Sequence, residues 1–196
     1  MNRFERIIAL IDEANAEDPN RERHEQREWP KELLYSHRMS AWLEVLRPDA
    51  PETLRIAVRA QHIRRWVRPR SDYPMDREGY LKWRRDLQDF HAGTTAELMG
   101  RAGYSESHME RVRFLLRKRR INRDPDSATL EDCACLVFLT HHLRAFGERT
   151  ESAKVVDILR KTWGKMSGQG RAEALKLDFP REVRPLIEAA LGGGSA

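Results

Sequence analysis

Apolar residues recur at helical spacing along most of the chain. Residues 3–16 illustrate the pattern. Ile7 and Ile8 lie three and four positions after Phe4, and Ile11 lies four and three positions after Ile7 and Ile8. This spacing is typical of an amphipathic α-helix, and no stretch shows the alternation of a strand. The pattern therefore predicts an all-α protein. Further helices are expected over residues 30–46, 50–67, 79–102, 105–120, 130–146, 151–166 and 181–191.

Prolines and glycines mark the ends of several predicted helices. Pro30 and Pro51 stand where a first helical turn tolerates proline. Gly103 is expected to end a helix, and Gly93 either to kink the helix over residues 79–102 or to divide it. The polar, glycine-bearing stretch after Met166 is read as a linker, with a mobile flap as the alternative.

Composition adds limits on location. A run of about 18 apolar residues, as a membrane span requires, is missing from the 196-residue sequence. The first twenty residues alternate in charge and lack an apolar signal core, so a cytoplasmic location is the default expectation. Cys133 and Cys135 lie two positions apart in an apolar run, where buried, reduced thiols are expected rather than a mutual disulfide.

The formal net charge is +5, and the basic residues gather in two clusters. Such clusters suit phosphates or nucleic acid, and a solvated helix face is the alternative for each one. The clusters consist of Arg55, Arg59, Arg64, Arg65, Arg68 and Arg70, and of Arg111, Arg113, Arg117, Lys118, Arg119, Arg120 and Arg123.

Four ionisable residues share helix faces with apolar neighbours at three- and four-residue steps. They are His37, His62, His91 and Asp132, each on a different predicted helix. All four are expected to point inward. An unpaired buried charge is costly, so Asp132 in particular needs a partner. A shared divalent metal and a metal-free histidine–aspartate network both satisfy this requirement.

The order of these residues resembles the HD superfamily of metal-dependent phosphohydrolases. "YSHRMSAWLEVL" is similar to the first histidine helix of that superfamily, and "LRIAVRAQHI" to the helix that carries its histidine–aspartate pair. "FHAGTTAELMGRAGYSESHMERVRFLLRKRR" is similar to the third histidine segment, and "LEDCACLVFL" to the last acidic helix. Gln61 and His62 stand where the superfamily has the pair, which makes a two-metal site doubtful.

A narrower resemblance is carried by "YSHRMSAWL", "RAQHIRRW", "GYLKWRR" and "ILRKTWGKMS". These strings resemble a family of uncharacterised bacterial and fungal proteins, some of which carry a glutamyl-tRNA synthetase label. A synthetase of that class needs an α/β nucleotide-binding domain with its signature motifs, and the helical pattern here has neither.

The superfamily resemblance implies a single helical domain over residues 1–196, folded as a helical bundle. It has an HD-like core at about 30–147, a helical extension at 150–191 and a disordered tail at 192–196. It also implies a divalent metal (Zn, Mn, Fe, Ni, Co or Mg) held by His37, His62 and Asp132. His91 and Glu131 are then the catalytic candidates.

The implied activity is hydrolysis of a phosphorylated small molecule or nucleotide by metal-activated water. Arg64, Arg65, Arg68 and Arg70 are the candidates for holding phosphate oxygens. The alternative is a non-catalytic helical module that binds nucleic acid or another anionic ligand through its arginines. No membrane partner is expected, and a homo-oligomer stays open.

Overall fold

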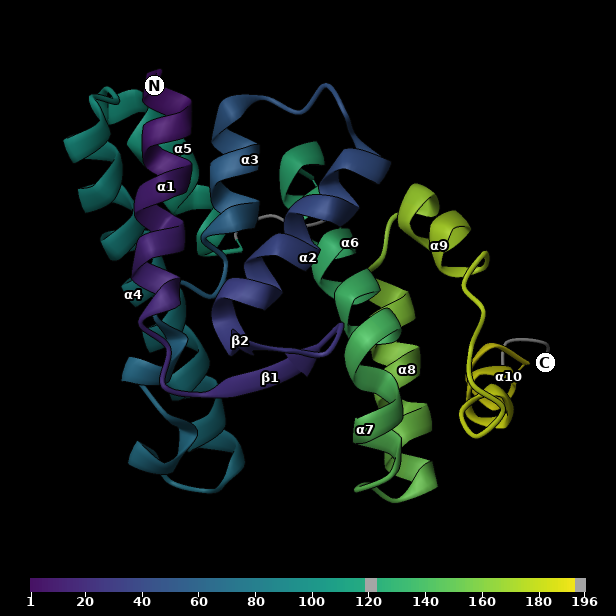
Figure 1. Cartoon of the computed structure of the whole chain (residues 1–196). Helices are drawn as coiled ribbons and strands as arrows, with labels where there is room; N and C mark the ends of the chain where they lie inside the picture. The colour runs from purple at the N-terminus through teal and green to yellow at the C-terminus, as the bar shows by residue number, and fades with distance from the viewer. Residues whose placement is uncertain (119–122, 193–196) are drawn as a thin grey trace. The chain divides into compact units, whose positions relative to one another are not determined.

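Helices make up nearly all of the regular structure in the computed structural model, which describes residues 1–118 and 123–192 (Figure 1). The predicted all-α class is confirmed. Arg119, Arg120 and residues 193–196 of the expected tail lie outside the described residues, and the first residue of that tail, Gly192, belongs to the last helix. The chain divides into two compact units, residues 1–120 and 121–196. The predicted division into core and extension stays a prediction, and each unit is described by itself.

The first unit contains five α-helices and one hairpin among its described residues. The helices are α1 (Arg3–Ala16), α2 (Lys31–Leu46), α3 (Glu52–Arg59), α4 (Arg77–Ala102) and α5 (Glu106–Leu116). The hairpin consists of β1 (Arg21–His24) and β2 (Arg27–Pro30), and two short 3₁₀ turns, η1 (Arg65–Val67) and η2 (Arg70–Asp72), join α3 to α4.

The helices of the first unit pack around a shared apolar core. α1, α2 and α3 contact one another, α4 contacts α1, and α5 packs against α3 and α4 (Figure 1). Fully buried side chains from each helix meet in this core, because their apolar stripes face inward. They include Ile7, Ile11, Met39, Leu43, Leu54, Ile56, Met99 and Leu115.

The hairpin is a feature that the hydrophobic pattern did not predict. β1 and β2 pair antiparallel, with Arg21 opposite Pro30 and His24 opposite Arg27. Glu25 and Gln26 form the turn, and both have positive φ, the pattern of a type I′ turn. Glycine and asparagine usually mark such turns, so a Glu-Gln pair carries almost no sequence signal.

The predicted helix over residues 50–67 is much shorter in the structure. α3 ends at Arg59, and His62 therefore lies in a turn rather than on a helix. Arg64 adopts the left-handed conformation with φ of 49°, and its backbone N–H donates to the Asn15 side-chain oxygen at 3.0 Å. This contact with α1 holds the turn, and the prediction of a helix there is wrong.

α4 is one helix of 26 residues that runs through Gly93 without a division. The Asp76 side chain caps its first turn by accepting from the Gly79 N–H at 2.7 Å. Gly103 ends it with φ of 89°, as predicted, since glycine adopts the left-handed cap at little cost. Ser105 then stands at the start of α5, also as predicted.

The second unit is built from α6 (Pro125–Val137), α7 (Leu143–Gly147), α8 (Ser152–Lys165), α9 (Gly168–Ala174) and α10 (Arg184–Gly192). A π-helical turn, η3 (Phe138–His142), joins α6 to α7. α8 packs against α10, α7 and α6, and α6 also contacts α9. The stretch predicted as a linker after Met166 therefore contains a short helix, α9.

Cys133 and Cys135 are buried and neither is part of a disulfide, as predicted. None of the helices in the described ranges is long and apolar enough to cross a membrane.

Candidate functional site

His62 is the centre of a polar cluster in the first unit. Its Nδ1 lies 3.2 Å from a Glu32 carboxylate oxygen, and its Nε2 lies 2.7 Å from an Arg65 guanidinium nitrogen. A guanidinium can only donate, so Nε2 accepts from Arg65. Nδ1 then carries the ring hydrogen and donates it to Glu32. The contacts thus favour a neutral His62 in the Nδ1–H tautomer.

Aromatic neighbours set the orientation of the His62 ring. Tyr35 stacks on it with ring centroids 4.0 Å apart and an angle of 10°. The His91 ring lies 6.1 Å away. Arg65, which donates to the His62 ring, has its guanidinium carbon 5.0 Å from the centroid of the Trp83 ring. The imidazole and the guanidinium are therefore both held in place by packing.

His91 is buried on α4, so its predicted inward orientation is confirmed. Its Nδ1–H donates to the Ile63 carbonyl at 2.9 Å. Burial lowers the pKa of His91 to about 3, and the nearby positive charge of Arg65 acts in the same direction. His91 is consequently neutral near pH 7 and too weak a base for ready proton abstraction there. Its predicted catalytic role stays a prediction.

His37 lies on the exposed side of α2, with 43 % of its side chain accessible, so the predicted inward orientation is wrong. The buried stripe of α2 runs through Leu34, Met39 and Leu43, and His37 is turned about 200° from Met39 on the helix. Its Nε2 accepts from Arg59 at 2.8 Å, and Arg59 in turn makes two 2.7 Å bonds to Asp12. Burial and the Arg59 charge lower the pKa of His37.

Asp132 is buried on α6, as predicted, and its partner is a helix start in the same unit. One carboxylate oxygen accepts from the Ser167 N–H at 2.8 Å, and the other from the Ser167 hydroxyl at 2.5 Å. Burial raises the pKa of Asp132, while these two hydrogen bonds oppose the rise. A Cβ at Gly170 would collide with the carboxylate, so the start of α9 closes directly over it.

Glu131, the second catalytic candidate, is also buried on α6. Its carboxylate lies 3.7 Å from the Lys165 ammonium at the end of α8. A buried carboxylate needs partners because an unpaired buried charge is costly, and Lys165 supplies one. The predicted role of Glu131 in proton transfer stays a prediction.

The four predicted phosphate-binding arginines fall into two groups. Arg64 pairs with Glu17 at 3.0 Å, and Arg70 donates to the Tyr73 and Asp76 carbonyls, so both hold local structure. Arg65 lies over Trp83, and Arg68 lies over the Phe90 ring at 5.1 Å. Within residues 1–118 and 123–192, no carboxylate oxygen lies within 4.0 Å of either guanidinium as an ion pair, although the Arg68 charge acts on the Asp86 carboxylate at longer range.

The predicted metal ligands do not fit a metal in the arrangement that the structure describes. The Nε2 lone pairs of His37 and His62 each accept from an arginine, and both Asp132 oxygens accept from Ser167. In the part of the chain that is described, histidine, cysteine, aspartate and glutamate side chains form no group of three or more that can hold a metal ion.

The sequence did not single out several residues of these clusters. Glu32 and Tyr35 contact His62, and Arg59 and Asp12 contact His37. Glu32 carries a signal in retrospect, since it shares a helical stripe with Ser36, Met39 and Leu43 and is itself buried. An acidic residue on an apolar stripe requires a partner. The contacts of Arg59 with His37 and Asp12, by contrast, join residues 22 and 47 positions apart and leave no local pattern.

The model of a family described as a domain of unknown function, DUF4202, matches residues 5–187. The chain belongs to the DUF4202 family. The match spans both units, so this domain includes the His62 cluster and the Asp132–Ser167 contact alike. Comparisons with curated proteins and with solved structures gave no match. The DUF4202 description names no activity, and the resemblance to HD phosphohydrolases stays a prediction.

Proposed function

We propose that the first unit of this DUF4202 protein binds a phosphorylated small molecule or nucleotide, with Arg65 and Arg68 holding the phosphate beside His62. The observation that carries the proposal is the surroundings of these two guanidinium groups. Each is positioned over an aromatic ring, and neither is neutralised by a carboxylate ion pair among the described side chains. Guanidinium groups that are held in place and keep their charge match phosphate oxygens in charge and geometry.

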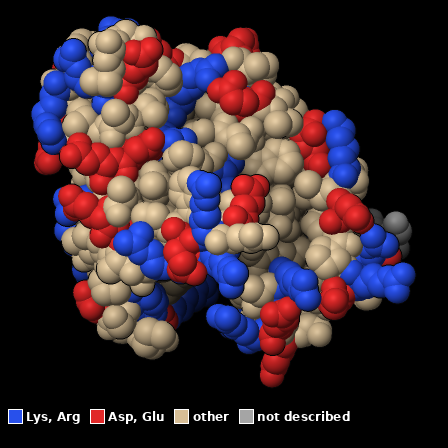
Figure 2. Space-filling view, viewed as in Figure 1, with Lys and Arg blue, Asp and Glu red and all other residues tan. Residues whose placement is uncertain are grey.

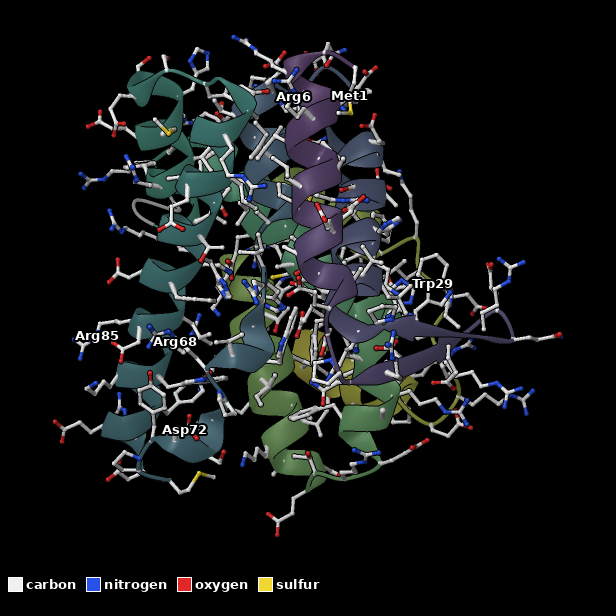
Figure 3. The ribbon with its side chains drawn as sticks, turned by 60° about the vertical axis from the view of Figure 1, so that its left-hand side comes forward. Met1, Arg6, Trp29, Arg68, Asp72 and Arg85 are labelled. Carbon is white, nitrogen blue, oxygen red and sulfur yellow. The ribbon has the colours of Figure 1, made fainter. Side chains whose placement is uncertain are left out.

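The packing of the two arginines supports the same ligand class. Trp83 and Phe90 come from one helix, α4, and hold the Arg65 and Arg68 side chains against it. Arg65 is partly buried, so a bound anion there is partly shielded from water and from salt. Figure 3 shows Arg68 and Arg85 on the side of the molecule where the first half of α4 lies.

Hydrolysis of the bound ligand is a separate step that rests on the resemblance alone. The His62 Nε2 accepts a hydrogen bond from Arg65. His62 can therefore take a proton from a water molecule only when that hydrogen bond is broken. Assays for phosphate release, with and without Mn²⁺, Co²⁺, Ni²⁺ or Mg²⁺, test this part. A cytoplasmic location and a homo-oligomer likewise stay predictions.

Titration calorimetry with inorganic phosphate and AMP tests the binding itself. We expect saturable binding, weakened about tenfold by Arg65→Met or Arg68→Met, because each removes charged hydrogen bonds worth about 1.5 kcal/mol or more. Methionine keeps an unbranched stem over the aromatic ring.

Arg101→Met is the matched control, because Arg101 is exposed on the same helix about 27 Å beyond Trp83. Binding by the Arg101→Met variant should equal that of the wild type. The proposal fails if neither ligand binds, or if all three variants bind as the wild type does.

A further inference from the structure

We infer that the Arg65 guanidinium takes the place of a metal ion at His62, which makes this cluster a metal-free cationic site. Histidines that bind metals give one ring nitrogen to the ion and donate the other N–H to a carboxylate or carbonyl. His62 has this arrangement with a different cation: Glu32 is on Nδ1 at 3.2 Å, and Arg65 is on Nε2 at 2.7 Å.

The backbone is shaped to bring Arg65 onto His62. Only two residues lie between them, and one of these, Arg64, takes the left-handed conformation. The Asn15 side chain fixes that turn by accepting the Arg64 N–H. Non-glycine residues adopt this conformation at a cost and keep it only when their surroundings stabilise it. The contact between Arg65 and His62 is thus a built feature of the turn.

The surroundings of Arg65 also keep its charge at this position. The guanidinium lies over Trp83 at 5.0 Å, and the negative face of the indole ring attracts a cation. An arginine stays protonated at every relevant pH, so its hydrogen bond to Nε2 is not lost by titration of the arginine. A divalent ion at Nε2 would have to displace this group against its positive charge.

The Arg65 guanidinium therefore supplies a permanent positive charge at the ring nitrogen where a metal-binding histidine holds its ion. The identity of the ligand as a phosphate ester rests on the proposed function. The hydrogen bond from Arg65 to the His62 Nε2 is independent of that function. A site of this kind binds its anion equally well with and without a chelator.

Two measurements on the full chain test the inference. The first is the metal content of protein purified with and without added Zn²⁺, Mn²⁺ and Co²⁺. The second is ¹⁵N NMR of the histidine side chains, which distinguishes a ring nitrogen that carries hydrogen from one that does not. We expect metal far below one ion per chain, and a His62 ring with hydrogen on Nδ1 only.

The Arg65→Met variant should shift the His62 Nε2 resonance, because the donor to that nitrogen is removed. Arg101→Met should leave the resonance unchanged, and circular dichroism establishes that both variants fold. If Arg65→Met does not fold, Arg65→Lys and Arg65→Gln replace it, since each changes the donor.

Two results would overturn the inference. One is a stoichiometric metal ion that is lost in His62→Gln. The other is absence of metal together with a His62 Nε2 resonance that no Arg65 variant shifts. Failure of phosphate or AMP to bind, with the expected metal and NMR results, would instead contradict the proposed function alone.

Discussion

At the scale of single residues, the polar groups of this chain are paired in ways that their spacing does not reveal. Helical spacing placed His91 and Asp132 inside correctly, because each lies on a stripe of apolar neighbours. Their partners, Ile63 and Ser167, are 28 and 35 positions away. Spacing within one helix carries no information about such partners, so it predicted burial but could not predict what a buried group does.

His91 makes stability dependent on pH, in a direction set by its burial. Its pKa is about 3 in the folded state, against 6.5 when unperturbed, so the unfolded chain takes up the proton first. The contribution of the His91 group to the free energy of unfolding is therefore fully present above about pH 6.5 and is lost as the pH falls toward 3. Between pH 7 and pH 5 we expect a loss of about 2 kcal/mol in the free energy of unfolding from this group.

Urea denaturation of wild type and His91→Asn at the two pH values measures this contribution. The variant should lack the loss assigned to His91, and His24→Asn, in the partly exposed hairpin, should retain it. The pKa of Asp132 is raised, so this group acts in the opposite direction in all three proteins. An unchanged pH dependence in His91→Asn would show that His91 is accessible to protons in the folded state.

At the scale of elements, long helices were predictable and turns were not. α4 and the start of α5 lie where periodicity and Gly103 placed them, because many residues contribute to each of those signals, whereas α5 ends at Leu116, inside the predicted range 105–120. The end of α3 and the hairpin turn each depend on one or two residues with positive φ and no glycine. Arg64 is held by Asn15, on another helix, and such a tertiary contact overrides local propensity.

Two of the three glycines of α4, Gly79 and Gly93, should respond in opposite directions to replacement by alanine. At Gly93 an added Cβ meets no atom within 4 Å, and alanine is the better helix former, so Gly93→Ala should stabilise the protein by about 1 kcal/mol. At Gly79 a Cβ would collide with the Pro74 carbonyl, so Gly79→Ala should destabilise it by about 1–3 kcal/mol.

Thermal and urea denaturation of the two variants measure both effects, and each variant is the control for the other. If Gly93→Ala destabilises the chain, α4 is bent at Gly93, as the sequence alone allowed. If Gly79→Ala is neutral, the loop that contains Pro74 yields more readily than the structure indicates.

At the scale of the whole molecule, the charge is positive but mixed. The formal net charge is +5, and Figure 2 shows acidic and basic side chains interspersed over the face it displays. Even residues 64–86, the most basic part of the candidate site, combine eight basic residues with four acidic ones. Composition revealed the excess of basic residues, but only the contacts separate the paired arginines from Arg65 and Arg68.

This distribution predicts weak binding of single-stranded oligonucleotides. With about two phosphates neutralised, the logarithm of the affinity should fall with the logarithm of salt at a slope of about −1.4, or roughly sevenfold between 50 and 200 mM. Fluorescence anisotropy with a labelled oligonucleotide measures the slope. The double variant Arg65→Met/Arg68→Met should flatten it. A much steeper slope would favour the nucleic-acid module over a site for one phosphorylated small molecule.

The π-helical turn at Phe138–His142 affects how residue roles can be carried between related chains. A π turn is what an α-helix forms when it accommodates one additional residue, and such turns often persist at functional sites. From Leu143 onward the helix is rotated by about a quarter turn relative to an uninterrupted α-helix that starts at Pro125. Counting helical positions forward from Asp132 therefore assigns the wrong face to every residue after the turn. A relative that lacks this one residue should be aligned to the chain with a gap inside Phe138–His142.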